Sequence, residues 1–235
     1  MSNVRTVSDT KRAFYTFHTR PINSIYRRIV DELMVEMHLL SVNADFRYDP
    51  IYGLGVVTAF DRFMQGYQPE QDSPSIFNAL CRSLEDDPQK YYQNANEVRS
   101  EAASLSTTDF LTRVQSSSEG WGLFGHLRAV AGNPNFKYSR LFAIGIYTLL
   151  EIMDEDLVKD EPRRNEVLKT IAEALNISAD KVQKDLELYR SNLEKLAQAQ
   201  LVMADILKAD RKKKEDRAKA KDAIVTPPNS SQEST

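Results

Sequence analysis

Apolar residues recur along most of the chain at spacings of three and four, which is the pattern of an amphipathic helix. Three of these stretches open at a polar residue followed by proline: Asp49-Pro50, Ser73-Pro74 and Asp87-Pro88. In such a pair the polar side chain can cap a helix, and the proline has the backbone angle of its first turn. The pattern predicts helices from 50 to 66, from 74 to about 86 and from 88 to about 103.

The same signals continue through the middle of the chain. Ser106 and Asp109 have the spacing of a capping box before another apolar face, and Pro162 opens a further amphipathic stretch. Residues 138–153 are apolar nearly all round, which favours a central buried helix, although periodicity alone also allows a pair of strands.

A proline divides the N-terminal region. "AFYTFHTRPINSIYRRIVDELMVEMHLL" would be one helix without Arg20-Pro21, because proline removes a backbone donor and disfavours helical geometry at the residue before it. We therefore expect a short first helix over 8–19 and a long second helix over 21–40.

The pattern changes after Ser178, because no proline or glycine occurs from there to Ala223. Roughly 45 residues of helix would extend about 65–70 Å, which is longer than a body of this size needs. We expect an all-α protein with a compact multi-helix body (1–176), a long projecting C-terminal coiled-coil-like helix (178–223) and a disordered tail (224–235). The helix has apolar residues in 4-3 spacing, interrupted only by Gln200: Val182, Leu186, Tyr189, Leu193, Leu196, Met203 and Leu207.

Charge is unevenly distributed between these parts. The net charge is −3, yet residues 208–221 hold eight basic and three acidic side chains, a net of +5, so the remainder carries −8. In a helix this basic segment can be a solvated face, can lie on an anionic membrane surface or can touch nucleic acid. The acidic body and the lack of interleaved aromatic residues argue against nucleic acid.

Other bulk features limit the class of protein. A single cysteine, Cys81, excludes an intramolecular disulfide and is consistent with a reducing compartment. The N-terminal residues have no signal-peptide pattern. The longest apolar run, 141–150, is far shorter than the roughly 20 residues of a membrane-spanning helix.

Four stretches resemble chemical sites, and each has a structural interpretation that we prefer. His18 and His38 lie on different predicted helices without a third metal ligand at matching spacing, which favours helix packing. "GWGLFG" matches a dinucleotide fingerprint but lacks the preceding strand, so we expect a tight connection that places Trp121 against a helix beginning near Leu123. "EIMDEDLVKDE" is expected to be a solvated helix end and loop, and Cys81 has no catalytic context. We therefore predict no enzymatic activity, no metal and no cofactor.

Two long blocks resemble a known family. "VRTVSDTKRAFYTFHTRPINSIYRRIVDELMVEMHLLSVNADFRYDPIYGLGVVTAFDRFMQGY" and "GWGLFGHLRAVAGNPNFKYSRLFAIGIYTLLE" are similar to the thylakoid formation protein family. With the charged C-terminal helix, the resemblance covers nearly all of residues 4–215 and is closest to the cyanobacterial form, since no transit peptide is seen.

The resemblance implies a non-enzymatic accessory factor for thylakoid membrane biogenesis and photosystem II repair. It implies a peripheral location at the thylakoid membrane, on the cytoplasmic side. The implied partner is an FtsH-type membrane protease complex, which the protein would bind and stabilise, with photosystem II contacted directly or through the protease. The family supplies no catalytic residues and no motif that maps the protease contact.

We expect the partner- or membrane-facing surface in the outer half of the long helix, where the apolar series runs into the basic segment. The residues are Met203, Leu207, Lys212, Lys213 and Lys214. The alternative is a pigment or lipid carrier in photosystem assembly, with His18, His38 or His126 as a chlorophyll ligand.

Overall fold

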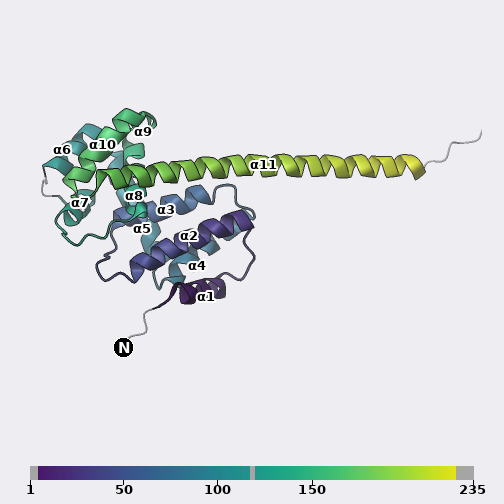
Figure 1. Ribbon diagram of the computed structural model, residues 1–235, viewed down its shortest axis with the longest axis horizontal. Helices are drawn as coiled ribbons and strands as arrows, with labels where there is room; N and C mark the ends of the chain where they lie inside the picture. The colour runs from purple at the N-terminus through teal and green to yellow at the C-terminus, as the bar shows by residue number, and fades with distance from the viewer. Residues whose placement is uncertain (1–4, 117–119, 226–235) are drawn as a thin grey trace, which may run out of the picture. The chain divides into compact units, whose positions relative to one another are not determined.

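The computed structural model describes residues 5–116 and 120–225, apart from the side chains of residues 207 and 218–225. All regular structure in these ranges is helical, which confirms the predicted all-α fold and the long C-terminal helix (Figure 1). In chain order the helices are α1 (Val7–Phe17), α2 (Ser24–Ser41), α3 (Pro50–Phe63), the 3-10 turn η1 (Glu70–Asp72), α4 (Ser73–Ser83), α5 (Pro88–Ala103), α6 (Thr107–Gln115), α7 (Leu123–Ala131), α8 (Arg140–Met153), α9 (Glu155–Lys159), α10 (Glu161–Ala174) and α11 (Ala179–Val225).

Side-chain caps place most of the predicted helix starts. Asp49 accepts hydrogen bonds from the backbone N–H groups of Ile51 and Tyr52, and Asp87 accepts one from Gln89. Ser106 accepts from the N–H of Asp109, as its spacing predicts. These bonds satisfy donors that a helix start otherwise leaves unpaired, so the local sequence defines where the helices begin.

The predicted cap at Ser73 is wrong. Ser73 is itself the first residue of α4, and the preceding Asp72 makes no side-chain capping bond. The Asp72 carboxylate instead forms an ion pair with Arg20, which lies in the break between α1 and α2. That break occurs where proline predicts it, and α2 begins at Ser24 under an Asn23 cap, three residues later than expected.

The acidic stretch 151–161 is also more ordered than expected. It contains the one-and-a-half-turn helix α9, whose N-cap Asp154 accepts a hydrogen bond from the N–H of Leu157. Leu157 and Val158 are buried, so this helix contributes to the core as well as exposing its carboxylates.

Helices α3 and α8 cross at the centre of the body with their backbones in close contact. A Cβ atom on Gly55 would lie 1.7 Å from the carbonyl oxygen of Leu141, and one on Gly145 would lie 2.0 Å from that of Ile51. Only a residue without Cβ permits either approach. Ten consecutive residues in each helix, 51–60 and 141–150, are buried around this crossing, which makes it the centre of the core.

The two central helices are preceded by matching connections. "NADFRYDPIYGLGVVT" leads into α3 and "NPNFKYSRLFAIGIYT" into α8, with Asn, Phe, Tyr, Gly and Thr in the same places. Asn43 and Asn133 each accept a hydrogen bond of 3.0 Å from the backbone N–H two residues on. An edge-to-face ring pair follows in both, Phe46–Tyr52 with centroids 5.1 Å apart and Phe136–Phe142 with centroids 5.0 Å apart.

The match extends to the flanking helices. Helix α1 packs on α4 as α6 packs on α10. Both α4 and α10 are followed by a residue with positive φ, Glu85 at 62° and Asn176 at 57°. The backbone N–H of Asp86 donates a hydrogen bond to the carbonyl of Cys81, and that of Ile177 donates one to the carbonyl of Ala172. These bonds close the C-terminal ends of α4 and α10 in the same way. The body therefore repeats one helical arrangement twice, a relation that our sequence interpretation missed.

The chain divides into two compact units, residues 1–191 and 192–235, and the division falls within α11. The first part of α11 belongs to the body, where Val182, Leu186 and Tyr189 are buried and the Tyr189 ring packs edge-on against Phe63. The N-terminal end of this helix thus packs on the body. Helix α11 continues to Val225, and the remainder of the predicted tail, 226–235, lies outside the described residues.

We predict that Gly55→Ala lowers the free energy of unfolding by about 3 kcal/mol or more, because the new methyl group meets a backbone oxygen that no rotamer change can move. Gly132→Ala is the control: its Cβ would lie 3.3 Å from the Arg128 carbonyl oxygen, and φ is −84°. It should change stability by less than about 1 kcal/mol. Urea unfolding followed by circular dichroism measures both, and equal effects would contradict the close crossing.

Candidate functional site

The C-terminal part of α11, residues 192–225, carries the residues that the sequence analysis selected for binding. Lys212, Lys213 and Lys214 are exposed, as are all residues from 208 to 217, and Met203 is half-buried. The side chain of Leu207 lies outside the described residues. The basic side chains are thus available to a partner, and the assignment of this segment as a binding surface stays a prediction.

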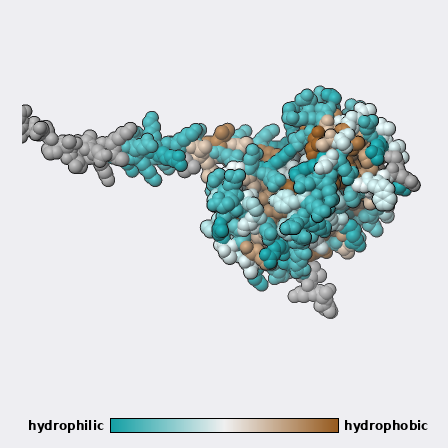
Figure 2. Space-filling model, turned by 180° about the vertical axis from the view of Figure 1, so that it is seen from behind, coloured by the Kyte–Doolittle hydropathy of each residue, from teal (hydrophilic) through white to brown (hydrophobic). Residues whose placement is uncertain are grey.

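An apolar patch that the sequence analysis did not select lies in the same segment. Leu201, Val202 and Ile206 are 67%, 59% and 56% exposed. Val202 and Ile206 are one helical turn apart and share a face of the helix, and Leu201 lies beside Val202 on the adjoining side. Figure 2 shows the change from hydrophobic to hydrophilic colour along this part of α11. The signal in the sequence was the pair of adjacent apolar residues at 201–202, outside the 4-3 series.

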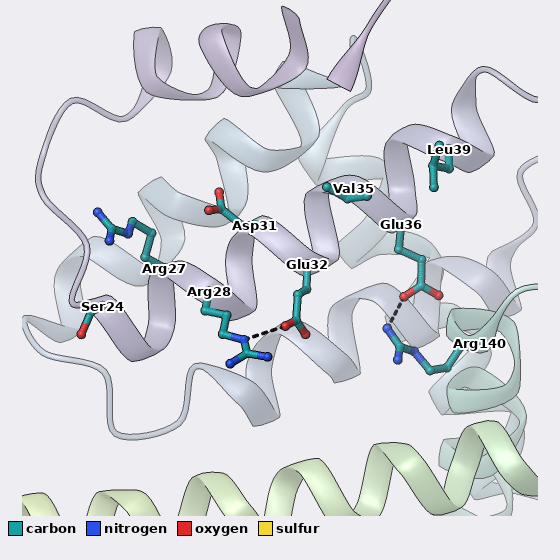
Figure 3. Close-up of a pocket in the computed structure, with 9 residues that line it drawn as sticks. All are labelled: Ser24, Arg27, Arg28, Asp31, Glu32, Val35, Glu36, Leu39 and Arg140. Carbon is teal, nitrogen blue, oxygen red and sulfur yellow. Dashed lines mark hydrogen bonds and ion pairs between the residues drawn. The ribbon is translucent and has the colours of Figure 1, made fainter. Parts of the chain in front are cut away.

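A groove of about 610 Å³ follows the exposed side of α2 (Figure 3). Val35 and Leu39, 37% and 58% exposed, form its apolar part. Its rim is charged, with three arginines and three carboxylates: Arg27, Arg28, Arg140, Asp31, Glu32 and Glu36.

The carboxylates of the groove are all engaged in ion pairs. Glu36 lies 2.5 Å from Arg140, Glu32 lies 2.9 Å from Arg28, and Asp31 lies 2.9 Å from Lys11. The groove therefore combines a short apolar strip with paired charges, which suits contact with another surface.

The two N-terminal histidines connect helices. Nδ1 of His38, in α2, lies 2.9 Å from the hydroxyl of Thr10 in α1, and Nδ1 of His18 lies 3.1 Å from the hydroxyl of Ser75 in α4. Both rings are buried, and burial lowers the pKa of each below its usual value. The preferred interpretation as packing histidines is confirmed, with one difference: Nε2 of His18 has no hydrogen-bond partner in the described part of the chain.

Metal and pigment ligation find little support in this arrangement. Within the described residues, no group of three or more His, Cys, Asp or Glu side chains is placed to hold a metal ion. His18 and His38 are buried between helices, whereas His126 is half-buried in α7. The carrier hypothesis stays an untested prediction.

Residues 120–122 of the "GWGLFG" stretch form a turn and residues 123–125 begin α7, and no strand precedes the stretch in the described residues. Helix α7 begins at Leu123 as predicted, but the expected packing of Trp121 is wrong, because this side chain is 96% exposed. Cys81 is buried in α4, and burial raises the pKa of its thiol, which disfavours a nucleophilic thiolate.

No helix in the described residues combines the length and the apolar composition that a bilayer crossing needs.

Comparison with known proteins gives a consistent result. A family model described as "Thylakoid formation protein" matches residues 6–218. "Protein Thf1" of Nostoc punctiforme is 60% identical over 235 residues, covering 99% of this chain and 100% of that protein. "Protein Thf1" of Crocosphaera subtropica is 58% identical, covering 91% of this chain and 88% of its own length.

A solved structure described as "Structure of Psb29" is also similar. It is 46% identical in sequence and superposes with a TM-score of 0.72. The match covers 82% of this chain and 98% of that chain.

We predict that acid destabilises the protein in part through His18 and His38. Well above about pH 6.5 both are neutral in the folded and unfolded chain. As the pH falls through about 6.5 towards their lowered folded pKa values, the unfolded chain binds protons first and the folded state loses stability. Replacing either with Gln should make the loss of unfolding free energy between about pH 6.5 and 5 smaller than in the unmodified protein. Urea unfolding at a series of pH values measures this, and an unchanged pH slope in both variants would refute it.

Proposed function

Because the chain belongs to the thylakoid formation protein family, we propose that it is a non-enzymatic accessory factor for thylakoid membrane biogenesis and photosystem II repair. In this role it binds and stabilises an FtsH-type membrane protease complex at the thylakoid membrane. It acts peripherally, on the cytoplasmic side, and its contact with photosystem II is made through the protease.

The observation that carries this proposal is the exposed apolar patch of α11, Leu201, Val202 and Ile206, followed directly by an exposed basic run. Apolar side chains on a solvated helix are unfavourable in water, and their burial against a partner contributes about 25 cal/mol per Å². The basic run adds attraction to an acidic surface, which increases the rate of encounter and orients the helix. Together they form a helix suited to a groove or a surface of another molecule.

The non-enzymatic role is supported by the way the charged groups are used. The carboxylates along α2 are held in ion pairs, and the buried histidines bond to hydroxyls of neighbouring helices. These groups stabilise the body, so we place function in surface contacts.

We predict that truncation after Ala199 weakens recovery of the protease from detergent-solubilised thylakoids by at least about tenfold. The truncated chain keeps the buried residues Val182, Leu186, Tyr189 and Leu196 and loses the apolar patch, so its body should stay folded. Quantitative pull-down with full-length and truncated protein measures this, with circular dichroism as the check on folding. Equal recovery of the protease would place its binding surface on the helical body.

A matched charge experiment tests the role of the basic run. Reversal of Lys212, Lys213 and Lys214 to Glu should weaken binding to anionic vesicles at least about tenfold at low salt, since each basic residue near such a surface contributes on the order of 1 kcal/mol. The effect should shrink at high salt because exposed charges are screened over about 8–10 Å. Reversal of Lys137, Lys169 and Lys184, which are exposed on the body, changes the net charge equally and should have a smaller effect. Equal losses in the two variants would show that only net charge matters.

A further inference from the structure

The repeat within the body also relates α5 to the first part of α11. The connections that precede α3 and α8 carry equivalent tyrosines, Tyr48 and Tyr138, and each binds the helix that closes its half of the body. The Tyr48 hydroxyl donates a hydrogen bond of 3.0 Å to the side chain of Asn94 in α5. The Tyr138 hydroxyl donates one of 2.9 Å to the carboxylate of Asp185 in α11. The two bonds fix which positions of α5 and α11 correspond.

An arginine follows five residues later in both helices, Arg99 in α5 and Arg190 in α11, and both are half-buried. In the first half of the body this cation has partners. Nη2 of Arg99 lies 3.3 Å from the hydroxyl of Thr58 in α3, to which it donates. Burial raises the pKa of Asp61, one turn further along α3, and the nearby Arg99 lowers it. The charge of Arg99 thus has a carboxylate beside it.

In the second half the equivalent groups are engaged elsewhere. The hydroxyl and the carboxylate that could serve Arg190 in the same way belong to Thr148 and Glu151 of α8. The Thr148 hydroxyl donates a hydrogen bond of 2.7 Å to a backbone carbonyl of its own helix, and Glu151 forms an ion pair with Arg62 of α3. Arg190 makes neither a hydrogen bond nor an ion pair within the part of the chain that the structure describes.

A second arginine, Arg164 of α10, lies beside Arg190. Helices α10 and α11 run antiparallel from the short connection 175–178, which places the start of α10 beside the third turn of α11. Gln183, two turns before Arg190 on the same face of α11, donates a hydrogen bond of 3.2 Å to the backbone carbonyl of Asn165. Burial lowers the pKa of the adjacent Arg164, and the nearby Arg190 lowers it further.

Arg164 has few partners for a cation that is only 6% exposed. Within the described residues it makes one hydrogen bond, of 3.0 Å, to the backbone carbonyl of Val158. Glu161 and Asp160, at the start of α10, act on Arg164 as opposite charges, but both are exposed and neither forms an ion pair with it. Two neighbouring cations, one of them buried, are unfavourable unless an anion accompanies them.

We propose that Arg164 and Arg190, together with the hydroxyl of Tyr147 in α8, bind a small oxyanion of the phosphate or sulfate type. Tyr147 is buried and lies close to Arg164. A guanidinium presents its N–H donors in a planar fork that matches two oxygens of such an ion. Arginines from two helices can therefore hold different edges of a tetrahedral ion, while the tyrosine hydroxyl donates to a remaining oxygen. The bound ion supplies the negative charge that Asp61 supplies to the equivalent Arg99.

The burial of Arg164 favours a free ion over a lipid headgroup. A phosphate that is fixed in the plane of a bilayer has little freedom to reach a guanidinium that is 6% exposed, whereas a small ion can enter beside the half-buried Arg190. None of the three residues belongs to the C-terminal part of α11. The site therefore holds or fails independently of the function proposed above.

Calorimetric titration of the full-length protein with sodium phosphate tests the site, in a chloride buffer of matched ionic strength. We expect saturable binding of one phosphate per chain, competition by sulfate and a rise of the thermal unfolding midpoint with phosphate concentration, since a ligand that binds only the folded state stabilises it. Phosphatidylglycerol vesicles are the second probe, and we expect them not to displace the free ion.

Matched variants assign the binding to these residues. Arg190→Gln should weaken phosphate binding at least about tenfold, because charge-assisted hydrogen bonds are lost. In phosphate-free buffer the same variant should not lower the unfolding midpoint, because it removes a cation that has no partner in the described chain. Arg99→Gln changes the net charge equally at the equivalent position and should leave the phosphate affinity unchanged.

Four results would overturn the proposal. They are stabilisation by phosphate no greater than by chloride, an unchanged phosphate affinity in Arg190→Gln, an equal loss of affinity in Arg99→Gln, and binding of the vesicles that depends on Arg190 without binding of free phosphate.

Discussion

The close crossing of α3 and α8 is the constraint on which the rest of the body depends. Gly55 of α3 lies against the backbone of α8 at Leu141, and Gly145 of α8 lies against the backbone of α3 at Ile51. The arrangement is reciprocal because the two helices occupy equivalent places in the repeat. It brings two largely apolar, buried stretches together, and the remaining helices pack around this centre. The turns at Asn43 and Asn133, which precede the two helices, set their directions of entry.

Because the interior of the body is used for packing, we expect function at its surface. The buried polar groups serve helix packing: His18 and His38 bond to hydroxyls of other helices, and Arg140 fixes α8 to α2 through Glu36. Some large apolar side chains are not buried in the core and are exposed to solvent. They occur on the C-terminal part of α11 beside its basic run, and at Trp121. On α11, apolar side chains with adjacent positive charge form the combination expected of contacts at an anionic membrane or an acidic partner.

Much of the local structure could be predicted from the sequence because its causes are local. The caps at Asp49, Asp87 and Ser106 and the break before Pro21 depend on a few neighbouring residues, and the structure has them. Ser73 failed because a distant group intervened: Asp72 pairs with Arg20 and leaves the cap unmade. The crossing at Gly55 could not be foreseen, since periodicity shows that a face is buried but not which helix covers it.

The candidate binding surface was predicted only in part, for the same reason. The basic run was visible as composition, and its lysines are exposed. The apolar residues beside it were sought on the 4-3 series, whereas Leu201, Val202 and Ile206 are the exposed large apolar residues among those described in this segment. Exposure depends on which side of a helix the rest of the molecule leaves uncovered, and spacing along the chain does not contain that information. Trp121 was misplaced in the same way, because a large ring was assumed to be buried.

Hydrogen–deuterium exchange of the full-length protein, alone and with the solubilised thylakoid protease complex, shows whether α11 makes the partner contact. We expect amides from 192 to 217 to exchange more slowly in the complex while those of α3 and α8 stay unchanged. Protection confined to the body, for instance along the α2 groove, with no change in α11, would contradict it.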